Sequence, residues 1–124
     1  MSRKTWLMPV NRPDLAAALS VPGFRVGTVS CGVKDPALKG KRTDLTIIAA
    51  DVDCHAAGTF TQNRFRAACV DLGEKSVLEH GSTIRAIVAN SGNANAGTGI
   101  RETEWAQMMI ATAADSLGVA ARQV

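Results

Sequence analysis

IRAIVANSGNANAGTG, residues 84–99, is the stretch of sequence that decides the fold. Its first six residues are compact and rich in β-branched side chains, which predicts a strand over residues 84–89. The next ten contain three Asn and three Gly, a composition typical of a loop. A helix is expected over residues 100–117, with Gly118 as its stop signal. Its expected buried stripe consists of residues that recur every three or four positions: Trp105, Met108, Met109, Thr112, Ala113 and Leu117.

Further elements are expected on either side of this unit. Alternating or apolar runs predict strands over residues 24–33, 44–51, 57–61 and 67–72. A short helix over residues 74–80 should be closed by Gly81. Residues 1–23 hold three of the four prolines, and residues 1–21 read as an irregular arm with a helical signal at 14–19. The sequence therefore predicts an α/β fold for residues 22–124.

Composition excludes several classes of protein. Of the 124 residues, 46% are hydrophobic and only 4% aromatic, which favours a core of small side chains. The net charge is +3, and the basic residues Lys39, Lys41 and Arg42 read as a solvated loop. Without a basic stripe interleaved with aromatics, nucleic-acid binding is not expected. There is no signal peptide or apolar run long enough to span a membrane, so we expect a cytoplasmic protein.

The three cysteines and two histidines give no metal-binding spacing. Cys31, Cys54 and Cys69 form no CxxC pair, and neither histidine completes a recognised ligand set. We therefore expect no metal, and reduced, mostly buried thiols.

The Asn/Gly loop is the leading candidate for a functional segment. Its candidate site residues are Asn90, Ser91, Gly92, Asn93 and Asn95. Two interpretations stay open. The loop precedes a helix N-terminus and could hold an anionic group there, or its own side chains could hold it in place. The GxxxxGK[ST] and GxGxxG patterns are absent, which disfavours a nucleotide cofactor.

No catalytic pair can be assembled from the remaining residues. Thr59 and Thr61 would share one face of a strand, although threonine is common on such faces. Asp51 and Asp53 would place two carboxylates together, but a turn at a strand end explains them equally well. No nucleophile has a neighbouring base.

Two segments resemble the ornithine acetyltransferase (glutamate N-acetyltransferase) family. Residues 90–99 are similar to its NSGNANA-x-TG signature, and residues 58–63 with Ala67, Ala68 and Val70 are similar to its G-x-FT-x-N…AAPV segment. Weaker matches at residues 23–25, 32–34 and 44–51 keep the same order. Cys69 stands where the family usually has Pro, and Gly97 stands where many members have Cys.

This resemblance implies a fold and an activity. The fold would be a layered sandwich of mixed sheet and helices, of the self-cleaving N-terminal-nucleophile type, and incomplete here. Residues 22–124 would be the N-terminal part of an acetyltransferase domain. The complete enzyme would move acetyl from N-acetylornithine to glutamate in arginine biosynthesis, through an acetyl-threonine formed after autocleavage. It would need no cofactor, and some members also accept acetyl-CoA as a co-substrate.

The same resemblance places the catalytic residues outside this chain. The nucleophilic Thr and the Thr-Gly pair that stabilises the oxyanion would lie beyond Val124, so no catalytic residue is expected here and the Asn/Gly loop would be scaffold of the substrate pocket. The partner would be a β chain from the same precursor, in a heterotetramer. Alone, the 124-residue chain should be inactive, with an apolar sheet edge that its missing half would cover.

Two alternatives accompany this interpretation. One is a related self-cleaving aminopeptidase. The other is a non-catalytic α/β module that binds a small anion through the Asn/Gly loop.

Overall fold

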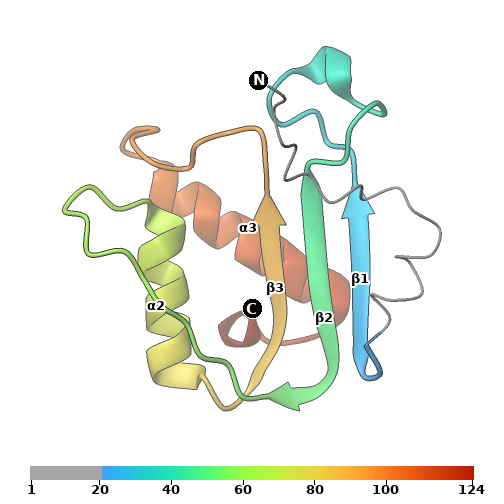
Figure 1. The fold of residues 1–124 in the computed structure, drawn as a ribbon, viewed down its shortest axis with the longest axis vertical. Coiled ribbons are helices and arrows are strands. Elements are labelled where there is room, and N and C mark those ends of the chain that lie inside the picture. The colour runs from blue at the N-terminus through green and yellow to red at the C-terminus, as the bar shows by residue number, and fades with distance from the viewer. Residues whose placement is uncertain (1–20) are drawn as a thin grey trace, which may run out of the picture.

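The computed structural model describes residues 21–124, which form a three-stranded sheet and two main helices (Figure 1). The strands are β1 (Phe24–Val29), β2 (Leu45–Cys54) and β3 (Ile84–Asn90). The helices are α2 (Ala68–His80) and α3 (Glu102–Leu117), with short 3-10 turns η1 (Pro36–Leu38) and η2 (Ala121–Gln123). The expected helical signal at 14–19, and all but the last residue of the expected arm, lie outside the described residues.

The sheet has the order β1-β2-β3, and both pairings are antiparallel. A mixed sheet, with both parallel and antiparallel pairs, was expected, but the strands of residues 21–124 form only antiparallel pairs. Val26 lies opposite Ile48, and Ile48 lies opposite Ile87, so these three side chains share one face. Helix α3 packs beneath the other face, beside Ile47 and Val88, with α2 alongside it (Figure 1).

The β2–β3 ladder is irregular between Ala49 and Cys54, where five residues advance on β2 against two on β3. The guanidinium of Arg85 lies at this irregular stretch and donates to the carbonyl oxygens of Ala50 and Asp51, both at 3.0 Å. Because a bulge leaves ladder carbonyls without a strand partner, the Arg85 side chain replaces the missing hydrogen bonds. Asp53 lies 3.7 Å from the same guanidinium.

The predicted strands over residues 57–61 and 67–72 are wrong. Residues 55–67 form no strand, and α2 begins at Ala68, six residues before the predicted helix. Over only six residues, the two-residue period of a strand cannot be distinguished from the 3.6-residue period of a helix, because the apolar run continues into the helix. The helix start is also stabilised from outside, because Arg66 forms ion pairs with Asp71, at 2.6 Å, and with Glu74.

The remaining boundaries follow the predictions closely. Helix α2 ends at His80, before Gly81, as expected. Helix α3 ends at Leu117 and is followed by Gly118, whose φ of 66° is the left-handed conformation predicted for a C-terminal glycine. The strands predicted over 44–51 and 84–89 are confirmed as β2 and β3, whereas the strand predicted over 24–33 ends at Val29.

The predicted buried stripe of α3 is only half right. Ala113 is buried, but Trp105 is 49% exposed and Met108 is 61% exposed. The helix turns Ala106, Ile110 and Ala114 inward with Ala113. Trp105 and Met108 instead line a groove of about 380 Å³ between α3 and β2, which we call the helix–sheet groove.

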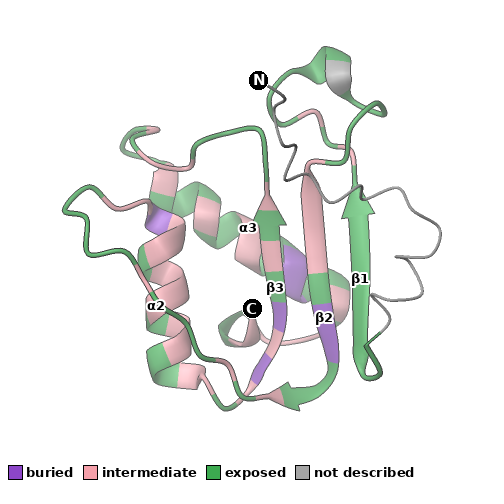
Figure 2. Ribbon diagram, in the orientation of Figure 1, coloured by how far each residue is buried: buried purple, intermediate pink, exposed green. Residues whose placement is uncertain are grey.

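Six of the seven buried residues among those described are alanines, in line with the small side chains that the composition predicted. The seven residues are Ala49, Ala50, Ala68, Ile84, Ala86, Ala113 and Ala114. All of β1 is exposed (Figure 2). We use the term open sheet face for Phe24, Val26, Ile48 and Ile87, four exposed apolar side chains on the side away from α3. The thiols are less buried than expected, since Cys31 is exposed and the other two are intermediate.

Candidate functional site

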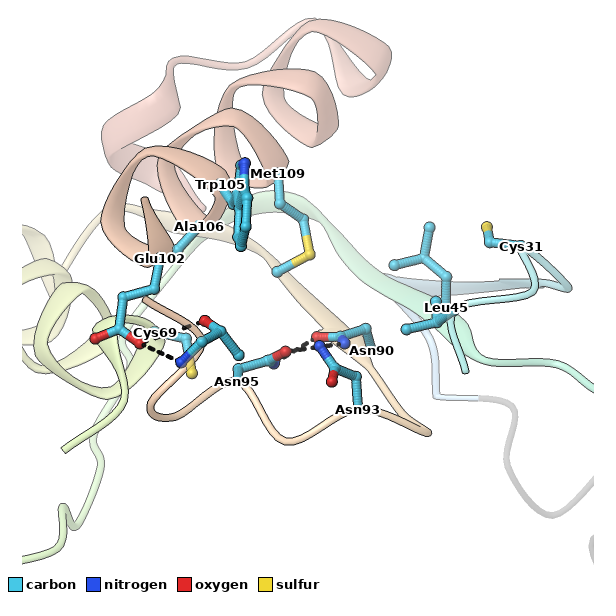
Figure 3. A pocket seen from close by; sticks show the side chains of 12 residues that line it. Cys31, Leu45, Cys69, Asn90, Asn93, Asn95, Glu102, Trp105, Ala106 and Met109 are labelled. Carbon is cyan, nitrogen blue, oxygen red and sulfur yellow. Dashed lines mark hydrogen bonds between the residues drawn. The ribbon is translucent and has the colours of Figure 1, made fainter. Parts of the chain in front are cut away.

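The candidate site is a pocket of about 290 Å³ where the Asn/Gly loop meets the start of α3 (Figure 3). Its walls come from the turn after β1, the start of β2, α2, the loop and α3. Its lining residues are Cys31, Val33, Leu45, Cys69, Asn90, Asn93, Asn95, Thr98, Glu102, Trp105, Ala106 and Met109. Of the five predicted site residues, Asn90, Asn93 and Asn95 line this pocket, and Ser91 and Gly92 do not.

The amides of Asn90 and Asn95 are hydrogen-bonded to each other. Nδ2 of Asn95 donates to Oδ1 of Asn90 at 2.7 Å, and Nδ2 of Asn90 donates back at 3.2 Å (Figure 3). Each side chain thus uses one donor and one acceptor on its partner. This reciprocal pair closes the loop across five positions, which favours the interpretation that the loop is held by its own side chains.

Glu102 holds the far end of the loop. Its carboxylate accepts hydrogen bonds from the backbone N–H of Thr98 at 3.3 Å and from the Thr98 hydroxyl at 3.4 Å. A carboxylate at a helix N-terminus is favourable because the helix dipole is positive there. The Glu102 carboxylate already uses two donors near the helix start, the N–H and hydroxyl of Thr98. Glu104 adds a second carboxylate to the first turn of α3, ion-paired with Arg101 at 3.0 Å. This arrangement counts against an anion-binding module.

Asp44 joins the loop to the opposite wall. Its carboxylate accepts hydrogen bonds from the backbone N–H groups of Cys31, at 2.6 Å, and Val33, at 2.7 Å. These bonds lower the pKa of Asp44 below its usual value because they stabilise the charged form, and the bond from Cys31 has the largest effect. Its backbone carbonyl accepts from the Ser91 N–H at 2.8 Å.

Gly32 makes the geometry around Asp44 attainable. Its φ is +74°, and a Cβ there would lie 3.1 Å from the Cα of Pro36. This left-handed residue lets the N–H groups on either side of it converge on one carboxylate. Sequence reasoning missed Asp44 as a site residue. The available signal was an Asp that begins a strand shortly after a Gly-containing turn.

The second segment singled out by the sequence contacts the Asn/Gly loop through Phe65. A Cβ on Gly97 would lie 2.9 Å from the Phe65 ring, so the ring rests directly on this glycine. Thr59 and Thr61 are not on a strand, and neither lines the pocket. Thr61 instead accepts a hydrogen bond from the Asn63 N–H at 3.2 Å, within a turn.

The pocket contains no nucleophile paired with a base. Glu102 is the one carboxylate in its lining, and it is engaged with Thr98. Asp51 forms an ion pair with Arg25 at 3.0 Å and Asp53 faces Arg85, so both act in the sheet. Across residues 21–124, no group of three or more potential ligands could hold a metal ion. No helix in the same range is long and apolar enough to cross a membrane.

Solved structures share this fold. The ArgJ protein of Bacillus halodurans matches with a TM-score of 0.73 and 32% identity, over 83% of this chain and 51% of that one. The Mycobacterium tuberculosis ornithine acetyltransferase, crystallised with ornithine, matches with a TM-score of 0.69 and 31% identity, over 83% of this chain and 53% of that one. The fold thus places the chain among proteins built like ornithine acetyltransferases.

Curated relatives agree with the structural matches. The arginine biosynthesis bifunctional protein ArgJ of Dehalococcoides mccartyi is 43% identical over 104 residues, and the mitochondrial protein of the same name from Clavispora lusitaniae is 40% identical over 91. A family model described as the ArgJ family matches residues 25–124, and the chain belongs to this family. The alignment with the Dehalococcoides protein includes 82% of this chain but only 24% of that relative's length. The alignment with the Clavispora protein includes 72% of this chain and 21% of that relative's length.

Proposed function

We propose that this chain is the N-terminal part of an enzyme that transfers acetyl from N-acetylornithine to glutamate in arginine biosynthesis. The observation that carries the proposal is the family match across residues 25–124, together with a fold shared with an ornithine acetyltransferase that was crystallised with ornithine. The Asn/Gly loop, the most specific motif of the resemblance, folds into the wall of a pocket, which supports a role as scaffold beside the substrate.

The proposed reaction uses a threonine that this chain does not supply. After autocleavage, the freed α-amine takes the proton from the hydroxyl of the same Thr, and the oxygen attacks the acetyl carbonyl of N-acetylornithine. The amide C–N bond breaks, ornithine leaves with the proton, and an acetyl ester remains. The amine of glutamate then attacks the ester, which releases N-acetylglutamate and restores the hydroxyl. In this scheme no cofactor takes part, and acetyl-CoA is an alternative acetyl donor.

The remainder of the enzyme is proposed to cover the apolar surfaces that the described residues leave open. On the open sheet face, Val26 is 61% and Ile87 is 59% exposed. The helix–sheet groove on the opposite side exposes Trp105 and Met108. Contiguous apolar surfaces of this kind favour burial against further polypeptide. A second layer on the open sheet face would complete the layered sandwich, and the β chain in a heterotetramer would bury further surface.

The experiment is an acetyl-transfer assay on the complete protein. Incubation with N-acetylornithine and glutamate should yield ornithine and N-acetylglutamate in equal amounts, and mass spectrometry should show two chains, with one beginning at Thr. A trapped acetyl group on that Thr would support the covalent route. The proposal fails if the complete protein is folded and transfers no acetyl group from either N-acetylornithine or acetyl-CoA.

Two controls separate this proposal from its alternatives. The 124-residue chain alone should be inactive in the same assay, because the nucleophile is absent. A panel of short peptides with free N-termini tests for aminopeptidase activity, which the complete protein should lack. Hydrolysis of these peptides without acetyl transfer would favour the related self-cleaving aminopeptidase.

A further inference from the structure

We propose that Asp44 is a positioning residue that sets the two opposite walls of the candidate pocket relative to each other. Its side chain and its backbone hold different segments. The carboxylate binds the N–H groups of Cys31 and Val33, at 2.6 and 2.7 Å, whereas the carbonyl oxygen binds the N–H of Ser91 at 2.8 Å. Cys31 and Val33 line one wall of the pocket, and Ser91 follows Asn90 in the other.

The turn at Cys31–Val33 is shaped to receive a carboxylate. Gly32 adopts a φ of +74°, so the N–H groups before and after it converge into the concave arrangement that binds anions in many proteins. Here the anion is the Asp44 side chain itself. Hydrogen bonds to a charged acceptor are shorter and stronger than those between neutral groups. The turn is therefore held by a charge and not by apolar packing, because Cys31 and Val33 are exposed.

The same residue is fixed in the sheet, which makes it a rigid reference for both walls. Asp44 immediately precedes β2, and its backbone N–H donates to the Val29 carbonyl at 3.1 Å, at the end of β1. On the far wall, the close approach of Lys34 to Gly92 brings the two segments together again, since a Cβ on Gly92 would lie 3.2 Å from Cβ of Lys34. Moving the turn would therefore disturb the Asn/Gly loop as well.

The first test measures backbone hydrogen exchange in the complete protein. Asp44→Asn keeps one acceptor oxygen but removes the charge. It should accelerate exchange in residues 30–34 and also in residues 90–96, by about tenfold, and leave α2 unchanged. The matched control is Asp35→Asn, because Asp35 also accepts a backbone bond, from Ala37 at 2.9 Å, but that bond only caps its own turn η1. Acceleration confined to residues 30–34 would overturn the proposal.

The second test is kinetic and rests on the proposed acetyl transfer. A displaced pocket wall should raise the KM for N-acetylornithine by about tenfold with little change in kcat, since the nucleophile lies elsewhere. A residue needed only for folding would lower kcat with the folded fraction and leave KM unchanged, and that result would overturn the positioning role. If the wild-type enzyme transfers no acetyl, the proposed function fails, and hydrogen exchange alone decides the role of Asp44.

A second variant keeps the proposal testable should Asp44→Asn fold poorly. Gly32→Ala leaves the carboxylate intact but strains the turn, because L-residues with a Cβ rarely adopt its φ. It should reproduce the faster exchange in residues 90–96 and the increase in KM. If it loosens the turn without affecting residues 90–96, the two walls are independent and the proposal is wrong.

Discussion

The two ends of the sheet are stabilised by different kinds of interaction. At the end where β3 begins, Ala86 and its register partner Ala49 are both buried, and Arg85 donates to carbonyl oxygens of the irregular ladder. At the end where β3 finishes, the pocket walls are held by side-chain hydrogen bonds, which the carboxylates of Asp44 and Glu102 accept and the amide of Asn95 donates. The comparison teaches that stability and site geometry are separable here, since packing provides the first and polar contacts provide the second.

The largest effect is expected from overfilling the alanine core. Ala113→Leu adds three carbons where the wild-type residue is only 4% exposed, and it should destabilise the protein by up to about 3 kcal/mol. Ala111→Leu, on the exposed side of the same helix, should change stability by less than about 0.5 kcal/mol. Urea unfolding of the complete protein measures both. Equal losses of stability in the two variants would show that the buried core is not confined to the face of α3 that carries Ala113.

Next in size is the loss of Arg85. Arg85→Met keeps the apolar stem but leaves the Ala50 and Asp51 carbonyls without their donor, at a cost of about 2 kcal/mol. The control is Arg25→Met, which removes the ion pair with Asp51 on the same strand, β2. The Arg25 side chain is 68% exposed. The cost of Arg25→Met should stay below about 1 kcal/mol. If thermal unfolding ranked the two variants in the opposite order, the bulge would not depend on the guanidinium.

A smaller and local effect is expected at the pocket end. Asn90→Ala and Asn95→Ala should each cost about 1 kcal/mol, and the double variant should cost about the same as either single one. Such a double-mutant cycle isolates the reciprocal amide pair. Additive losses would indicate that the two side chains act independently. Exchange in residues 91–97 should accelerate in each variant, whereas the core strands should stay protected.

The smallest effect is a dependence of stability on pH at Asp44. The pKa of Asp44 is lowered in the folded protein. Its contribution to the free energy of unfolding is therefore fully present above its pKa in the unfolded chain, about 4, and is lost as the pH falls through its lower pKa in the folded protein. The melting temperatures of wild type and Asp44→Asn should therefore differ at neutral pH and converge in strong acid. A constant difference across this range would contradict the charged role of the carboxylate.

Much of this fold could be predicted because its strands and its last helix carry strong local signals. The β-branched run before Asn90 and the left-handed Gly118 both act through local backbone preferences. The start of α2 could not be predicted in the same way, because Arg66 stabilises it from outside the helix. The exposure of Trp105 also escaped prediction, because helical periodicity identifies an apolar face without showing what covers it.

The candidate site was predicted in composition but not in geometry. Three Asn in six residues identified the loop, yet which amides would pair depended on the path of the backbone. Asp44 lies 46 positions before Asn90 and was not predicted, since only the sheet register brings its carbonyl to Ser91. Long-range pairing of this kind leaves no periodic pattern in a single sequence.

The contact between Phe65 and Gly97 has a consequence for the history of this family. Because the ring lies where a side chain at position 97 would begin, the two positions cannot enlarge independently. Homologues with a larger residue at position 97 should carry a smaller or redirected one at position 65. An alignment of many members should thus display these two columns as a covarying pair, linking two motifs that lie 32 positions apart.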